Sequence, residues 1–454
     1  MQRSAPGHVR AEVLRAALPS MAAMLLSAAG TFADALFLSR AGAQASAAAG
    51  AAFPLLCAVQ TIGFTLGMGS GSAVSRLCGS GDTDLAQRCA GCALLSALLL
   101  GGALSAIGLG LHAPLLRLLG APAESAAEAA AYTRSLLLAA PLICLSLTLS
   151  SLLRGLGRTM PSLAAYGGGA LAGTALCWYL SVVRGMGAAG AGIALLAREG
   201  ITALVLAGAA LRLLPRVSLS AVRGLLPLCV PRLFVLREIM RSGLPTLLRQ
   251  GAMSAGSLLL TRACTAFGAE AVGGMGLAVR SGVLLSSAVI GFGQGFQPVC
   301  GRAIGAGDAD RVRAAYRFCM RCVVLSLLAA GALLFPAAGM LLALTGAPEE
   351  IVSFGAAVLR AQALTLPAQG AVIMMTMLTQ AAGLPVRATL VSASRQGLFL
   401  IPLVLLLPRM IGRTGLVLCQ AASDLISLPF CWLLTRSLLQ HMPLPRRNSH
   451  AARD

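Results

Sequence analysis

Asp34 is the residue of this sequence best suited to ion chemistry, because it lies inside an apolar stretch at residues 15–39. An ionised carboxylate within a bilayer costs about 2.5–3.5 kcal/mol on insertion scales, so such residues usually face a cavity and serve a function. Burial disfavours the charged form, so protonation can switch a helix or release a bound cation. The alternative is an Asp at the membrane surface, since the stretch ends nearby and Arg40 follows. We expect ion coupling at Asp34.

Two more acids, Glu199 and Asp424, interrupt apolar stretches later in the chain. For both we expect structural pairing with an arginine rather than proton transfer, because acids within membrane spans are commonly paired. Glu199 directly follows Arg198. The other arginines within apolar stretches that can serve as partners are Arg249, Arg280 and Arg395. Contact of Arg280 or Arg395 with an anionic substrate is the alternative.

Polar and soft side chains within the apolar stretches are candidates for a substrate cavity. Amide side chains can contact a substrate, although any single one is better explained by hydrogen bonds between helices. Methionine offers adaptable apolar surface that suits broad specificity, and it also packs in ordinary cores. The cavity candidates are Gln250, Arg280, Gln294, Gln369, Arg395 and Met374.

The composition shows what kind of protein must position these residues. Of 454 residues, 57% are hydrophobic and 11% are charged, and the mean hydropathy is +0.84. Soluble domains carry about a quarter of charged residues, so this chain is expected to be a polytopic membrane protein. The net charge of +20 suggests nucleic acid, but the arginines are spread among connecting loops and aromatic residues make up only 4%. Since no platform for stacking bases is present, we expect no nucleic-acid partner.

Twelve apolar stretches of about 20 residues, the length that crosses a bilayer, predict an all-α membrane protein with twelve transmembrane helices. The predicted spans are 15–39, 47–74, 89–112, 131–153, 161–183, 188–211, 243–266, 273–298, 319–343, 356–380, 389–408 and 414–438. Arginines concentrate in the loops after even-numbered spans, whereas loops after odd-numbered spans are poorer in arginine. By the positive-inside rule, both termini are expected in the cytoplasm.

The sequence repeats itself after 226 residues, which aligns Leu18-Pro19 with Leu244-Pro245 and Pro141 with Pro367. Near the end, a shift of 225 pairs Glu199 with Asp424. Each half has an even number of spans, so both halves enter the membrane from the same side and form a parallel repeat about a pseudo-twofold axis. That layout suits alternating access. The predicted parts are an amino-terminal lobe at 1–211, a cytoplasmic linker at 212–241, a carboxy-terminal lobe at 242–440 and a cytoplasmic tail at 441–454.

The stretch CGSGDTDLAQR at 78–88 and its copy IGAGDADRVRA at 304–314 resemble a phosphate or metal loop. A phosphate loop needs a preceding strand and usually a lysine, which this chain lacks, and calcium needs more oxygen ligands than two Asp residues supply. Both stretches are therefore predicted to be tight turns whose Asp caps the next helix.

The C-x-x-C pairs have no further ligands nearby and the histidines are far apart, so we expect no metal, no cofactor and no enzyme activity.

Three stretches, in order along the chain, resemble one known family. They are GTFADALFLSRAGAQASAAAGAAFPL from Gly30, GFGQGFQPVCGRAIGAGDADRVR at 291–313 and QAAGLPVRATLVSASRQGLFLIPLVLLLP at 380–408. Together with Ser423-Asp424, their order and spacing resemble the multidrug and toxic compound extrusion (MATE) transporters, of the bacterial DinF and NorM type, over essentially the whole chain. The resemblance implies a twelve-helix, two-lobe protein, expected as a monomer in a bacterial inner membrane, that exports organic cations or drugs against inward flow of H⁺ or Na⁺.

The resemblance also implies ion coupling at Asp34, which matches the acidic residue of the family's first helix. In the fifth helix the family often carries an Asn and an Asp four residues apart, but these positions are Gly173 and Cys177 here. A Na⁺ site needs several oxygen ligands, so H⁺ is favoured as the coupling ion. Gln250 stands where some members carry Glu, so no second cation site is expected. The superfamily also includes flippases for lipid-linked saccharides, which are the alternative function.

Overall fold

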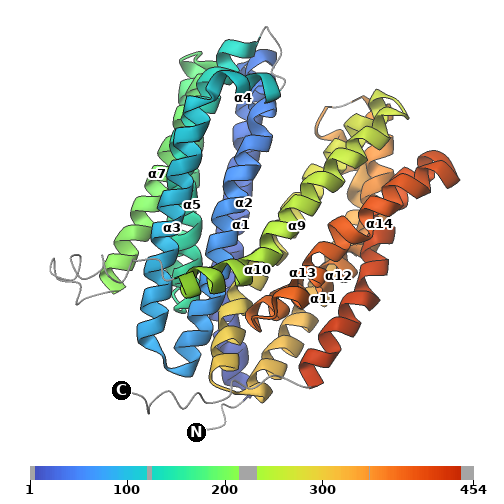
Figure 1. Ribbon diagram of the computed structural model, residues 1–454. Coiled ribbons are helices and arrows are strands. Elements are labelled where there is room, and N and C mark those ends of the chain that lie inside the picture. Colours follow the sequence, from blue (N-terminus) through green and yellow to red (C-terminus); the bar gives the residue numbers. More distant parts are fainter. Residues whose placement is uncertain (1–5, 120–124, 214–232, 347, 441–454) are drawn as a thin grey trace. The chain divides into compact units, whose positions relative to one another are not determined.

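The computed structural model describes residues 6–119, 125–213, 233–346 and 348–440, and the regular elements of these residues are all helices (Figure 1). The all-α prediction is confirmed for this part of the chain. The predicted tail 441–454 and most of the predicted linker lie outside the described residues.

Two compact units make up the chain. The first unit runs from Ala16 to Gly243, and the second combines Met1–Arg15 with Leu244–Asp454. Helices α1 (Pro6–Ala41) and α9 (Leu233–Thr265) each begin in one unit and continue in the other. Because α9 begins at Leu233, helix extends into residues that the sequence assigned to a linker.

Each unit is organised around one buried central helix, α5 in the first and α12 in the second. In the first unit α5 contacts α2, α3 and α7, and in the second α12 contacts α10, α11 and α14. The remaining helices of the first unit are α2 (Ala43–Ser80), α3 (Thr83–Gly110), α4 (His112–Leu119), α5 (Ala126–Gly155), α6 (Met160–Cys177), the π-helix η2 (Trp178–Val183) and α7 (Gly187–Leu213). Those of the second are α10 (Ala269–Gly305), α11 (Ala309–Ala343), α12 (Glu349–Ala381), α13 (Pro385–Ala393), the π-helix η3 (Ser394–Leu398) and α14 (Leu400–Gln440).

The 226-residue repeat is visible in this packing. The shift places α2 on α10, α3 on the start of α11 and α5 on α12, so the two central helices are equivalent and contact equivalent neighbours. Both central helices also contain a proline at the same point, Pro141 and Pro367. The prediction of two related six-span lobes is confirmed by this agreement between sequence shift and helix contacts.

Nine helices in the described residues are long and apolar enough to cross a membrane. One of them covers Pro385–Gln440 and breaks near Gly412, where φ is +59°, so it holds two of the predicted spans. The predicted span at 161–183 is α6 continued by η2. The predicted span at 243–266 lies in α9, whose arginines lower its hydropathy. Every predicted span thus corresponds to a helical segment.

The G-x-G-D stretches form the predicted turns. The Asp82 carboxylate accepts a hydrogen bond from the Leu85 backbone N–H at 3.0 Å, and Asp308 accepts one from the Arg311 N–H at 3.0 Å. These are N-caps of α3 and α11. The second glycine of each turn has positive φ, which L side chains rarely adopt, so its identity follows from the turn.

Helices α1 and α9, which each begin in one unit and continue in the other, are held near their starts by equivalent ion pairs. In the second unit Glu12 of α1 pairs with Arg302 at 3.4 Å and also with Arg311. In the first unit Glu238 of α9 pairs with Arg76 at 3.1 Å. The 226-residue shift converts Glu12 into Glu238 and Arg76 into Arg302, so this contact is inherited from the repeat.

Candidate functional site

Asp34 of α1 is paired with Arg198 of α7 inside the first unit. The side chains are only 15% and 12% exposed, so the pair is largely removed from solvent. The arginine Nη2 donates to Asp34 Oδ2, while Asp34 Oδ1 and Arg198 Nε have no hydrogen-bond partner among the described residues. Such an ion pair can exchange partners, because Asp34 Oδ1 and Arg198 Nε each gain a hydrogen bond when a new partner reaches them.

Gly173 of α6 makes room for this arginine. A Cβ at position 173 would lie 2.7 Å from Arg198 Cβ and 2.9 Å from Nε, closer than real Cβ contacts. Any larger side chain there would have to displace Arg198. The position where the family resemblance leads one to expect an Asn is therefore filled by an arginine that reaches across from α7.

Glu199 lies beside Arg198 on α7 but has a different partner. Its carboxylate accepts a hydrogen bond from Ser146 of α5 at 3.2 Å, and it feels the Arg198 charge through space. We expected Glu199 to pair with an arginine, but its hydrogen-bond partner among the described residues is Ser146. We call Asp34, Arg198 and Glu199 the first-unit cluster. Its two carboxylates and one guanidinium leave one negative charge.

In the second unit Asp424 of α14 pairs with Arg395 of η3, one of the partners expected from the sequence. Asp424 is nearly buried, with 5% of its side chain exposed. Its other oxygen accepts from Thr365 of α12 at 3.4 Å. With its amide oxygen towards Arg395, Gln369 accepts from Nη2 at 3.0 Å and from Nη1 at 3.3 Å. Arg395 is therefore held from both sides.

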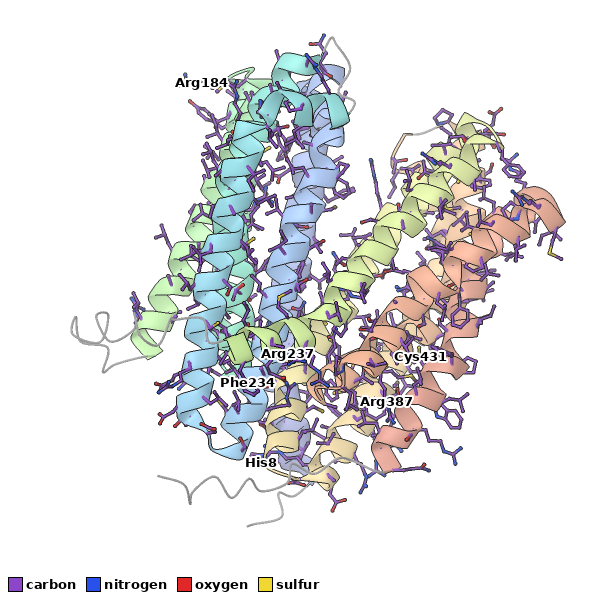
Figure 2. The ribbon with its side chains drawn as sticks, in the orientation of Figure 1. His8, Arg184, Phe234, Arg237, Arg387 and Cys431 are labelled. Atoms are coloured by element: carbon purple, nitrogen blue, oxygen red, sulfur yellow. The ribbon has the colours of Figure 1, made fainter. Side chains whose placement is uncertain are left out.

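The π-helical turn that carries Arg395 is fixed by α14. Ser394 Oγ lies 3.1 Å from the sulfur of Cys431, and the Ser423 hydroxyl donates to the backbone carbonyl of Arg395 (Figure 2, Cys431 labelled). π-Helical turns often occur at functional sites, where the extra residue turns a side chain inward. Here the turn presents the guanidinium to Asp424.

Arg249 of α9 lies near Arg395, close enough for the two positive charges to repel each other. Its side chain is half-buried, and in the part of the chain that the structure describes it forms no hydrogen bond or ion pair. We call Arg249, Arg395 and Asp424 the second-unit cluster. Its two guanidinium groups and one carboxylate leave one positive charge.

The other cavity candidates are not brought to this cluster by hydrogen bonds among the described residues. Met374 is fully buried and packs in the second unit. Gln294 is also buried, with an unpartnered Oε1, whereas Gln250 is half-buried and Arg280 is exposed. The role of Arg198 was missed in the sequence. The signal that points to it is the glycine at position 173, where an oxygen ligand was expected.

No group of three or more His, Cys, Asp or Glu side chains that could hold a metal ion occurs among the described residues. Of the C-x-x-C cysteines, Cys89, Cys92 and Cys319 are buried within the helix packing. Their burial agrees with a role in helix packing.

Two related six-span units with ionisable side chains inside their spans are typical of secondary transporters built from internal repeats. The MatE family model matches residues 19–195 and 245–406, and the chain belongs to this family of transporters.

Solved structures agree with this assignment at the level of the fold. A mutant of the Vibrio cholerae MATE transporter VcmN is 21% identical, with a TM-score of 0.87 over 97% of this chain and 99% of that one. A MOP superfamily transporter from Pyrococcus furiosus is 23% identical, with a TM-score of 0.87 over 96% and 97%. MATE transporters of this fold have twelve transmembrane helices, which confirms the predicted number of spans.

One curated relative matches a shorter stretch. A protein named FAD transporter from Shewanella oneidensis is 31% identical over 147 residues, which is 32% of this chain and 32% of that protein. The match therefore covers about a third of the relative's length.

Proposed function

We propose that this protein is a secondary active exporter of organic cations or drugs, coupled to H⁺ at the first-unit cluster. The observation that carries the proposal is the Asp34–Arg198 pair, which lies within membrane-spanning helices. One polar atom of each partner has no hydrogen bond to any residue that the structure describes. The protein acts as a monomer in a bacterial inner membrane, with both termini in the cytoplasm.

Protonation is the step that the cluster supports best. A proton on Asp34 removes the charge that holds Arg198, and the released guanidinium lies next to a second carboxylate, Glu199. Arg198 thus has one partner on α1 and another on its own helix, α7. Exchange between them loosens or tightens the contact between α1 and α7. A ligand that binds one arrangement better shifts the protein towards it.

An organic cation can take the place of the proton in this scheme. Bound beside Asp34, it competes with Arg198 for the same carboxylate, so proton and substrate exclude each other, as antiport requires. Na⁺ is a poorer fit, because it needs several oxygen ligands and the guanidinium of Arg198 already occupies Asp34. H⁺ is therefore the proposed coupling ion.

Transport of ethidium from proteoliposomes, under separate H⁺ and Na⁺ gradients, tests the proposal. We expect wild-type export to follow the H⁺ gradient and Asp34→Asn to abolish it, because the amide cannot exchange a proton. The matched control is Asp84→Asn, which neutralises an exposed acid of the same unit and should leave export unchanged. Equal gradient-driven export by Asp34→Asn and wild type would exclude Asp34 from coupling.

A flippase for a lipid-linked saccharide or other lipid-like substrate is the second candidate. The observation that favours it is the positive second-unit cluster, in which Arg249 has no ion-pair partner among the described residues. The partial match to a protein named FAD transporter also supports a substrate that carries phosphate. Absence of ethidium transport under either gradient would favour this candidate over drug export.

A further inference from the structure

Among the residues that the structure describes, Arg249 is a positive charge inside the second unit without a counter-charge. The paired carboxylates of that unit have other partners: Asp424 pairs with Arg395, Glu12 with Arg302 and Arg311, Glu270 with Arg413, and Asp310 with Arg313. Asp308 caps α11, and Glu349 and Glu350 are exposed at the start of α12. Among the described residues, no acid of the unit is left for Arg249.

The position of Arg249 makes this absence costly. It lies in the predicted span at 243–266, and an arginine within a membrane span is costly unless it has a partner or faces a water-filled cavity. Its half-buried side chain lies near Arg395, so repulsion between like charges adds to the cost. An arginine retained under these conditions needs a compensating interaction, and within the unit the described residues supply none.

Arg395 cannot move to relieve the repulsion. Asp424 holds its Nε, Gln369 accepts from both terminal nitrogens, and Ser423 binds its backbone carbonyl. Ser286 of α10 also donates to the Gln369 oxygen, at 2.7 Å. The guanidinium of Arg395 is therefore held in place by its hydrogen bonds. The guanidinium of Arg249 has no such partner among the described residues and can bind a ligand.

We propose that Arg249 binds the phosphate group of a small molecule or lipid, with the fixed charge of Arg395 behind it. A guanidinium presents a planar fork of N–H donors that matches phosphate oxygens in bidentate geometry. An anion beside Arg249 neutralises the net positive charge of the second-unit cluster and removes the repulsion between the two arginines. This inference deepens the second candidate function, on which it rests, by naming the residue and the chemical group that it binds; it does not depend on ion coupling at Asp34.

Binding of riboflavin 5′-phosphate and riboflavin to the purified full chain in neutral detergent tests the proposal, because the two probes differ only in the phosphate. We expect wild type to bind the phosphate form about tenfold or more tightly, as a charge-assisted hydrogen bond provides. Arg249→Gln should remove this preference, and Arg249→Lys should keep part of it. The control Arg262→Gln, at an exposed arginine of the same helix, should retain it fully.

Three results would overturn the proposal. They are equal binding of both probes by wild type, an unchanged preference in Arg249→Gln, and an equal loss in Arg262→Gln, which would indicate general charge attraction. Elution volume and thermal unfolding show whether each variant is folded. If Arg249→Gln does not fold, Arg249→Lys still tests the proposal.

Phosphatidic acid in phosphatidylcholine nanodiscs separates the two sources of phosphate. Displacement of the flavin by phosphatidic acid through Arg249 assigns the site to a lipid headgroup, and Arg249-dependent flavin binding without displacement assigns it to a soluble molecule.

The binding test is separable from the transport test. Export of ethidium that depends on Asp34, combined with no phosphate preference, would overturn only this inference. Phosphate binding that depends on Arg249, combined with no ethidium export, would overturn only the proposed drug export.

Discussion

The two units share a scaffold but differ in the charge of their polar clusters. The first-unit cluster has two carboxylates and one guanidinium, and the second-unit cluster has two guanidinium groups and one carboxylate. The 226-residue shift places Leu260 where the first unit has Asp34, and it places Ala23 where the second has Arg249. The repeat has therefore kept helix packing while its ionisable residues have diverged.

The physical reason is that packing and charge are under different constraints. Helices that approach closely need glycine or another small residue at the contact; Gly101, for example, leaves a Cβ position only 2.8 Å from Pro141 Cα. Such positions tolerate little change in either unit. A charge within a span needs only one suitable partner, which can come from any neighbouring helix. Acid and arginine positions are thus free to change as long as the partner changes too.

The largest expected effect comes from removing Arg395. Arg395→Ala leaves the nearly buried Asp424 without its counter-charge, and loss of one partner of a buried ion pair costs about 3–5 kcal/mol. Arg198→Ala should cost less, because Asp34 is more exposed and loses a pair that already leaves Oδ1 unsatisfied. Thermal unfolding in one detergent compares the two. An equal loss would show that the clusters do not differ in burial, and Arg395→Ala/Asp424→Ala should recover part of the stability.

A smaller effect is expected at Gly173. In Gly173→Ala the added methyl meets the Arg198 side chain, and overpacking typically costs about 1–3 kcal/mol. The displaced arginine should also hold Asp34 less well, so the pH dependence of ethidium export should shift. Gly168→Ala on the same helix is the control, since nothing lies within 4 Å of its Cβ position. Identical pH profiles for the two variants would contradict a link between Gly173 and the Asp34 pair.

The smallest effect is expected where the units are alike. Asp82→Ala and Asp308→Ala each remove an N-cap with the same 3.0 Å hydrogen bond, so each should cost about 1 kcal/mol. Thermal unfolding of both variants measures the difference between them. A difference well above the cap's own contribution would show that the two turns are not equivalent, although their sequences repeat.

Much of the fold was predictable because its signals are local. Apolar length predicted the spans, turn chemistry predicted the caps at Asp82 and Asp308, and the constant shift predicted the duplication. The candidate site was predictable only in part. Asp34, Asp424 and Arg395 were identified as residues, and Arg395 was among the partners expected for Asp424. Arg198 was considered only beside Glu199, because residues adjacent in sequence are easily linked and residues on different helices are not.

The sequence by itself determined the class of protein, the two-unit organisation and the acids that matter, since hydropathy and spacing depend on residues close together in the chain. Only the tertiary structure decided which charges meet. Asp34 and Arg198 are 164 positions apart, and their contact depends on how α1, α6 and α7 are rotated and on the space that Gly173 leaves. The same reasoning applies to Arg249: its residue type is in the sequence, but its lack of a partner within the described part of the chain follows from where the acids of the second unit are already engaged.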